Sequence, residues 1–181
     1  MTSSPGLKRG WLKETIWEAG RVLFCMPAEA FGSRLNVHYP QSAPSPPRVD
    51  KIHVGLVKEL LRKSWCAETA TRGKWSPEVP SLNQCAVSAL VVQDLLGGEL
   101  LRCEMTNRDS HYWNRLPDGR EVDLTTEQFE YLGAYPRRET MVVRNRAYVL
   151  SYPDTMRRYA ILLQRVAYAL WPLKTKNSAA P

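Results

Sequence analysis

The chain has 181 residues, of which 44% are hydrophobic, and this length and composition predict a globular protein with one core of ordinary size. Its 4 cysteines form no CxxC pair, and its 3 histidines are far apart, so we expect neither a metal site nor a cofactor. No apolar run approaches the roughly 20 residues that cross a bilayer, and no secretory signal is evident. We therefore expect a cytoplasmic protein with reduced thiols and no transmembrane segment.

The net charge of +7 is unevenly distributed along the chain. Residues 99–135 carry a net charge of −4, whereas residues 136–181 carry +7. A basic third of a chain is compatible with binding to nucleic acid or another polyanion. No nucleic-acid motif accompanies the arginines, so we expect them to form local ion pairs and solvated helix faces. The arginines in question are Arg137, Arg138, Arg144, Arg146, Arg157, Arg158 and Arg165.

The first 48 residues form a predicted extension. Residues 10–24 have the spacing of an amphipathic helix, which is compatible with docking on the core, with a membrane-surface segment, or with sequence upstream of the domain. Four prolines in residues 40–47 indicate a linker. We expect a single domain over residues 49–172 and a disordered tail over 173–181.

Two helices are predicted in the first half of this domain. Apolar residues between 52 and 61 recur at helical spacing, and the helix is expected to end at Trp65. The second helix spans 84–96, with Ser81 or Asn83 as its cap and two glycines after it. Because residues 86–92 are apolar nearly all round, this should be the buried central helix.

The second half predicts strands followed by helices. Strands are expected at 99–105, 110–116 and 120–125, and a short helix should begin at Thr125 or Thr126. A last helix spans about 153–170 and should stop at Pro172. Its predicted buried stripe consists of Met156, Ala160, Leu163, Ala167 and Leu170. Helices that flank a block of hairpin strands indicate an α+β domain, in which the cysteine-bearing helix packs on a small antiparallel sheet.

Cys85 lies at the predicted start of the central helix. A thiol attacks as its thiolate, and both a helix N-terminus and a nearby imidazolium favour that anion. His111 could provide the imidazolium. The alternative is that Cys85 is a small buried hydrophobic residue, as most free cysteines are. We interpret the three other cysteines as packing residues.

The segment after His111 predicts a hairpin that places an acid beside it. Pro117, Asp118 and Gly119 read as a three-residue loop, which sets His111 and Asp123 diagonally on one face of the sheet. A two-residue turn would put them on opposite faces. With the first register Asp123 would orient the imidazole, as the acid of a catalytic triad does. The competing interpretations are that Asp123 caps the Thr125 region and that His111 is a half-buried strand residue.

Further residues could contribute to this site. The side-chain amide of Gln84 could donate to a developing oxyanion, or could be exposed to solvent in the first helical turn. Trp65, Trp75 and Trp113 could form walls of the site, although large aromatic residues are usually part of the core.

Several stretches of the sequence resemble the YunG-like family of small bacterial proteins. They are SLNQCAVSALVVQD at 81–94, SHYWNRLPDG at 110–119 and VDLT at 122–125. The resemblance spans roughly residues 50–168 and implies domain limits but no activity. More loosely, the order Cys, His, Asp is similar to the papain-like and transglutaminase-like thiol fold, which implies a cysteine at the start of the central helix. The short spacings here imply a small or dedicated substrate.

The sequence therefore predicts a cysteine hydrolase or acyltransferase that acts on an amide, peptide or thioester. Cys85 would be the nucleophile, His111 the general base and then acid, and Asp123 the orienting group, with Gln84 beside them. The alternative is a non-catalytic binding domain on the same fold. The expected partner is a small molecule or a peptide rather than a nucleic acid.

Overall fold

A four-stranded antiparallel sheet with strand order β3-β2-β1-β4 forms one layer of the domain. The computed structural model describes residues 52–175, so the predicted helix at 10–24 and the predicted linker at 40–47 lie outside the described residues. The strands are β1 (Glu99–Met105), β2 (Ser110–Arg115), β3 (Glu121–Val122) and β4 (Pro136–Arg144). The helices are α2 (Val54–Ser64), α3 (Cys85–Leu96), α4 (Gln128–Leu132), α5 (Arg146–Leu150) and α6 (Pro153–Thr175), with a short 3₁₀ turn, η2, at Thr71–Gly73.

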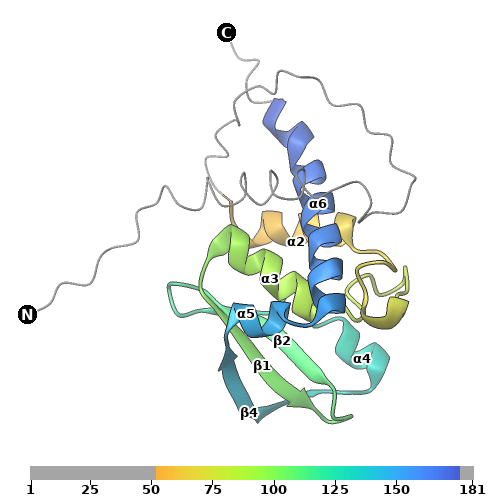
Figure 1. Cartoon of the computed structure of the whole chain (residues 1–181), viewed down its shortest axis with the longest axis vertical. Helices are drawn as coiled ribbons and strands as arrows, with labels where there is room; N and C mark the ends of the chain where they lie inside the picture. The colour runs from red at the N-terminus through yellow and green to blue at the C-terminus, as the bar shows by residue number, and fades with distance from the viewer. Residues whose placement is uncertain (1–51, 176–181) are drawn as a thin grey trace, which may run out of the picture. The chain divides into compact units, whose positions relative to one another are not determined.

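The helix α3 is the centre of the domain, as its apolar sequence predicts. It packs on β2 at one side and on α6 at the other, and α2 packs against α6 (Figure 1). Seven of its twelve residues are buried, among them Leu90 and Val91 with no exposed surface. The helices form one layer and the antiparallel sheet forms the other. The architecture is therefore α+β, as predicted.

The cap that was predicted for α3 is wrong. The N-cap residue is Gln84, and its side chain makes no capping hydrogen bond. Asn83 instead takes a left-handed backbone conformation, and its side-chain amide donates to the carbonyl of Lys74. The Ser81 hydroxyl is buried without a hydrogen-bond partner in the described part of the chain. The Asn83 side chain therefore holds the loop before α3 against Lys74 and does not cap the helix.

The hairpin between β2 and β3 has the predicted register. Asn114 lies opposite Val122, and Arg115 lies opposite Glu121. The N–H of Leu116 donates to the carbonyl of Arg120, which closes the predicted three-residue loop. β3 is shorter than predicted, because its pairing with β2 stops at Val122.

The two faces of the sheet have different neighbours. On the α3 face, Leu100 packs with Ala89, Leu90 and Val149. On the opposite face, Leu101, Cys103 and Trp113 form a second cluster, with Met141 of β4 against it. Successive side chains of β1 thus point to opposite faces of the sheet and contribute to two separate parts of the core. The same alternation along β2 determines the face on which each site residue lies.

The last helix differs from expectation at its end and along its buried side. α6 continues through Pro172 to Thr175, so residues 173–175 are helical rather than part of a tail. Of the predicted stripe, Leu163 and Leu170 are buried but Met156 is 52% exposed, and Leu162 and Val166 are buried as well. Arg158 is also buried: its guanidinium pairs with Asp154 and donates to the carbonyl of Thr69.

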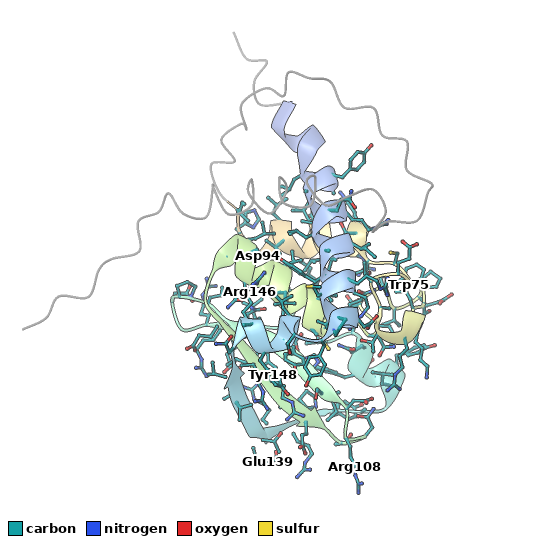
Figure 2. All side chains as sticks on the ribbon, in the orientation of Figure 1. Trp75, Asp94, Arg108, Glu139, Arg146 and Tyr148 are labelled. Atoms are coloured by element: carbon teal, nitrogen blue, oxygen red, sulfur yellow. The ribbon has the colours of Figure 1, made fainter. Side chains whose placement is uncertain are left out.

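A polar cluster joins α3, α5 and α6. Arg146 and Asp94 lie side by side between α5 and α3 (Figure 2) and pair at 2.9 Å. The Tyr159 hydroxyl donates to the same carboxylate at 2.6 Å. Burial raises the pKa of Asp94, and the Arg146 charge opposes that rise. Each polar group of the cluster has a partner, so we interpret it as a structural link.

The C-terminal arginines are largely engaged within the protein, as the local ion-pair interpretation predicts. Salt bridges occupy Arg137, Arg138, Arg146, Arg157 and Arg158. Arg165 donates to the carbonyl of Ser64, whereas Arg144 stacks on Tyr148. Within residues 52–175, no helix is long and apolar enough to span a membrane.

Gly98, which follows α3, gives a stability prediction. It has φ +89°, and a Cβ there would lie 2.1 Å from the Arg115 carbonyl oxygen. Gly98→Ala should therefore lower the free energy of unfolding by about 3 kcal/mol or more, as measured by urea denaturation. The matched control is Gly133→Ala, at φ +60° with nothing within 4 Å, where only backbone strain of about 1 kcal/mol is expected. Equal losses in the two variants would contradict the close approach of α3 and the hairpin.

Candidate functional site

The candidate site lies where β3 ends beside β2. Because β3 pairs only with Asn114 and Arg115, it leaves the β2 edge at Ser110–Tyr112 without a β3 partner. Cys85 is the first residue of α3, and its Sγ lies 3.8 Å from the carbonyl oxygen of Ser110. The side chain of Cys85 is half-buried. The early end of β3 therefore lets the helix start approach the sheet.

His111 and Asp123 are in direct contact. His111 Nε2 lies 2.6 Å from Asp123 Oδ2, which is the diagonal pairing that the hairpin register predicts. Both residues belong to the face of the sheet that carries Trp113, because alternate strand residues share a face. Nε2 is the ring nitrogen that contacts Asp123, and Nδ1 takes no part in this contact.

His111 is a buried residue with a strongly altered acidity. Its side chain is 2% exposed, and its ring stacks on Trp113 and meets the edge of Phe129. Burial by itself lowers the pKa, but hydrogen bonds to Asp123 and to Cys85, together with their negative charges, outweigh it. The result is a pKa raised to about 10, so the imidazole is held in its charged form.

Asp123 uses both of its oxygens. Oδ2 contacts His111, while Oδ1 accepts hydrogen bonds from the backbone N–H and the hydroxyl of Thr125. The two interpretations drawn from the sequence, orientation of His111 and capping of the Thr125 region, therefore both describe this residue. Thr125 fixes the carboxylate in the position from which it contacts the imidazole.

Gln84 does not have the placement predicted for an exposed first-turn residue. It has no exposed surface, and its side-chain nitrogen donates to the carbonyl of Cys66 at 3.0 Å. Its Oε1 is buried without a hydrogen-bond partner among the described residues. The amide nitrogen that was considered for an oxyanion is therefore bound to the Cys66 carbonyl.

Two cavities adjoin the site. One of about 10 Å³, enough for a single water molecule, lies beside Cys85 between α3 and the hairpin, with Ser88, Asn114 and Thr125 in its lining. The other, about 160 Å³, lies along the opposite face of the sheet. Its lining is His111, Trp113, Glu121, Asp123, Pro136 and Arg138. The small cavity is therefore too small for any molecule larger than water to contact Cys85 from within it.

The remaining candidates are distributed as follows. Trp113 lines both cavities. Trp65 and Trp75 line neither of them. The indole nitrogen of Trp65 donates to the Ser88 hydroxyl, and that of Trp75 donates to the Pro80 carbonyl. Cys103 is fully buried, and burial raises the pKa of its thiol, which fits a packing role. Within residues 52–175, no group of three or more His, Cys, Asp or Glu residues could hold a metal ion.

Comparison with known proteins places this domain in a family. A Bacillus subtilis (strain 168) protein described as "Uncharacterized protein YunG" is 38% identical over 74 residues, which cover 41% of this chain and 61% of that relative. No solved structure matches the chain. Residues 53–170 match the family described as YunG protein, and this range includes all the described strands and the whole candidate site. The chain therefore belongs to the YunG family.

Proposed function

We propose that this protein is a cysteine hydrolase or acyltransferase that acts on an amide, peptide or thioester. Cys85 is the nucleophile, His111 the general base and acid, and Asp123 the residue that orients the imidazole. The observation that carries the proposal is the 2.6 Å contact between His111 and Asp123, together with the place of Cys85 as the first residue of α3.

The electrostatics support a thiolate–imidazolium pair. The charge that Cys85 carries as a thiolate is among the causes that raise the pKa of His111, so a thiolate at Cys85 and a charged imidazole would stabilise each other. The N-terminus of α3 adds a second source of stabilisation, because the first N–H groups of a helix lack intrahelical partners and point toward an anion. Both effects favour a nucleophile that is active at neutral pH.

The reaction then follows from the positions of these groups. The Cys85 thiolate attacks the carbonyl carbon, a C–S bond forms, and the N–H groups at the start of α3 stabilise the oxyanion. The His111 imidazolium gives its proton to the leaving group as the bond from carbon to nitrogen or sulfur breaks. Water or another acceptor then loses a proton to His111 as it attacks the thioester, which restores the thiolate.

The order of these residues supports a papain-like or transglutaminase-like arrangement. A cysteine begins the central helix, the histidine follows on β2, and the acid follows directly after β3. One observation favours the alternative of a non-catalytic binding domain: the cavity beside Cys85 holds only about 10 Å³. That alternative requires an unreactive thiol.

An activated ester gives the test. We expect p-nitrophenyl acetate to acetylate Cys85, with a burst of p-nitrophenolate near one equivalent and an acetyl group on the Cys85 peptide in mass spectrometry. Cys85→Ala should remove both signals. Cys66→Ser is the matched control, since Cys66 is another half-buried thiol, and it should retain them. Acetylation spread evenly over the cysteines would contradict the proposal.

A further inference from the structure

A basic and aromatic surface adjoins Cys85 on the α3 face of the sheet. It contains two arginines and three tyrosines, from β1, β2, β4, α5 and the turn that precedes α6. We call this the Arg144 surface, and its members are Arg102, Tyr112, Val142, Arg144, Tyr148 and Tyr152.

The strand register places these residues on one face. Arg144 lies opposite Leu100, which packs against α3, so Arg144 belongs to the same face as the helix. Arg102 lies opposite both Tyr112 and Val142 and is two residues from Leu100, which sets it on that face as well. Tyr148 of α5 lies over this part of the sheet (Figure 2), and its ring is 5.2 Å from the Arg144 guanidinium carbon.

Ser110 and Tyr112 connect this surface to the nucleophile. The Arg102 guanidinium donates to the Ser110 hydroxyl at 2.8 Å, and the carbonyl of the same residue contacts Cys85 Sγ. Burial and the charge of Cys85 raise the pKa of Tyr112, while the charges of Arg102 and Arg144 lower it. Tyr112 therefore lies within electrostatic range of the nucleophile and both arginines.

Arg144 carries a charge that no described carboxylate neutralises. Arg102 has Glu104 at 4.0 Å, but Arg144 has no ion-pair partner within residues 52–175. Its Nε is buried without a hydrogen-bond partner there. A buried, unpartnered donor is costly, and a ligand anion would satisfy it.

The tyrosines next to Arg144 leave apolar area exposed. Tyr148 and Tyr152 are 46% and 51% exposed, and their hydroxyls are hydrogen-bonded at 2.8 Å, which keeps the two rings in an edge-to-face arrangement. Val142, opposite Arg102 on the same face of the sheet, is 41% exposed. An arginine that stacks on the Tyr148 ring suits a ligand with an anionic group on an apolar body.

We propose that the Arg144 surface binds an anionic group, a carboxylate or a phosphate, of the acyl substrate that Cys85 attacks. The inference rests on the proposed function and adds the substrate class to it. The Arg144 guanidinium binds the anion through its planar fork, Arg102 adds a second positive charge, and the Tyr148 ring covers the adjoining apolar part.

Paired alkylating reagents test this without knowledge of the substrate. Iodoacetate and iodoacetamide alkylate the same thiol, but only iodoacetate is an anion. We expect the ratio of their rate constants at Cys85, iodoacetate over iodoacetamide, to fall about 3- to 10-fold in Arg144→Gln. Arg144→Lys should retain most of the ratio, because the positive charge stays. Arg120→Gln is the matched control, since it removes an exposed arginine from the hairpin loop, and its ratio should equal that of the wild type.

The His111 imidazolium attracts iodoacetate equally in the wild type and in the three arginine variants. Its contribution therefore cancels when their rate ratios are compared. Protection of Cys85 from iodoacetamide identifies the anion: protection by inorganic phosphate assigns a phosphate group, and protection by hexanoate assigns a carboxylate. Equal ratios in wild type and Arg144→Gln would overturn the inference while leaving the proposed function intact. A Cys85 that reacts with iodoacetamide no faster than Cys66 would instead contradict the proposed function.

Discussion

Replacing His111 by alanine is expected to slow the acetylation of Cys85 by p-nitrophenyl acetate by about 10²- to 10⁴-fold, the usual contribution of a general base and acid. In the proposed mechanism the imidazole holds the proton of the thiol and later gives it to the leaving group. The rate is measured as the p-nitrophenolate burst at pH 7. Because His111 packs against Trp113 and Phe129, the alanine change also leaves a cavity.

A second variant separates the chemical effect from the packing effect. Asp123→Asn preserves the shape of the side chain and its contacts with Thr125 but removes the charge next to the imidazole. We expect it to slow acetylation substantially, though less than His111→Ala does, with little change in the urea midpoint. An Asp123→Asn protein that acetylates at the wild-type rate would show that the carboxylate acts only on the Thr125 region.

The imidazole of His111 is expected to stay protonated far above its ordinary range. With a pKa raised to about 10, its ring should keep the imidazolium chemical shift at pH 8, where an ordinary histidine, with a value near 6.5, is neutral. Nuclear magnetic resonance of ¹⁵N-histidine-labelled protein measures this, and His111→Gln assigns the signal. Asp123→Asn and Cys85→Ala should each move the transition to lower pH, because each removes a cause of the rise.

The raised pKa of His111 also determines how this residue affects the stability of the fold. The folded pKa lies above the unfolded one, so the stabilisation from the bound proton is complete below about pH 6.5 and is lost as the pH rises through about 10. The difference in free energy of unfolding between wild type and His111→Gln should therefore decrease over that window. A His111 ring that titrates near pH 6.5 would contradict the ion pair.

The contact between His111 and Asp123 could be predicted because local chemistry determines the hairpin register. Pro117, Asp118 and Gly119 specify a three-residue loop, and Gly119 indeed has φ +86°. A fixed register then determines which side chains are diagonal neighbours. The central helix could also be predicted from local sequence, because a long apolar run followed by two glycines is typical of a buried helix and its end.

Other features depend on contacts between residues far apart in the chain. β4 was not predicted, because it is an edge strand with an irregular exposure pattern and a register shift opposite Arg102 and Glu104. The burial of Gln84 depends on the Cys66 carbonyl, 18 positions earlier. The burial of Arg158 in α6 accompanies a hydrogen bond to the Thr69 carbonyl, 89 positions earlier. No local pattern encodes these partners.

The pH dependence of alkylation at each cysteine tests the central claim most directly. Wild type and His111→Ala are treated with iodoacetamide between pH 5 and 10, and labelling of each cysteine is measured by mass spectrometry. We expect fast, selective labelling of Cys85 well below pH 8, and we expect His111→Ala to slow it markedly. Labelling of Cys85 no faster than that of Cys25 or Cys103, or labelling only after unfolding, would contradict the catalytic interpretation.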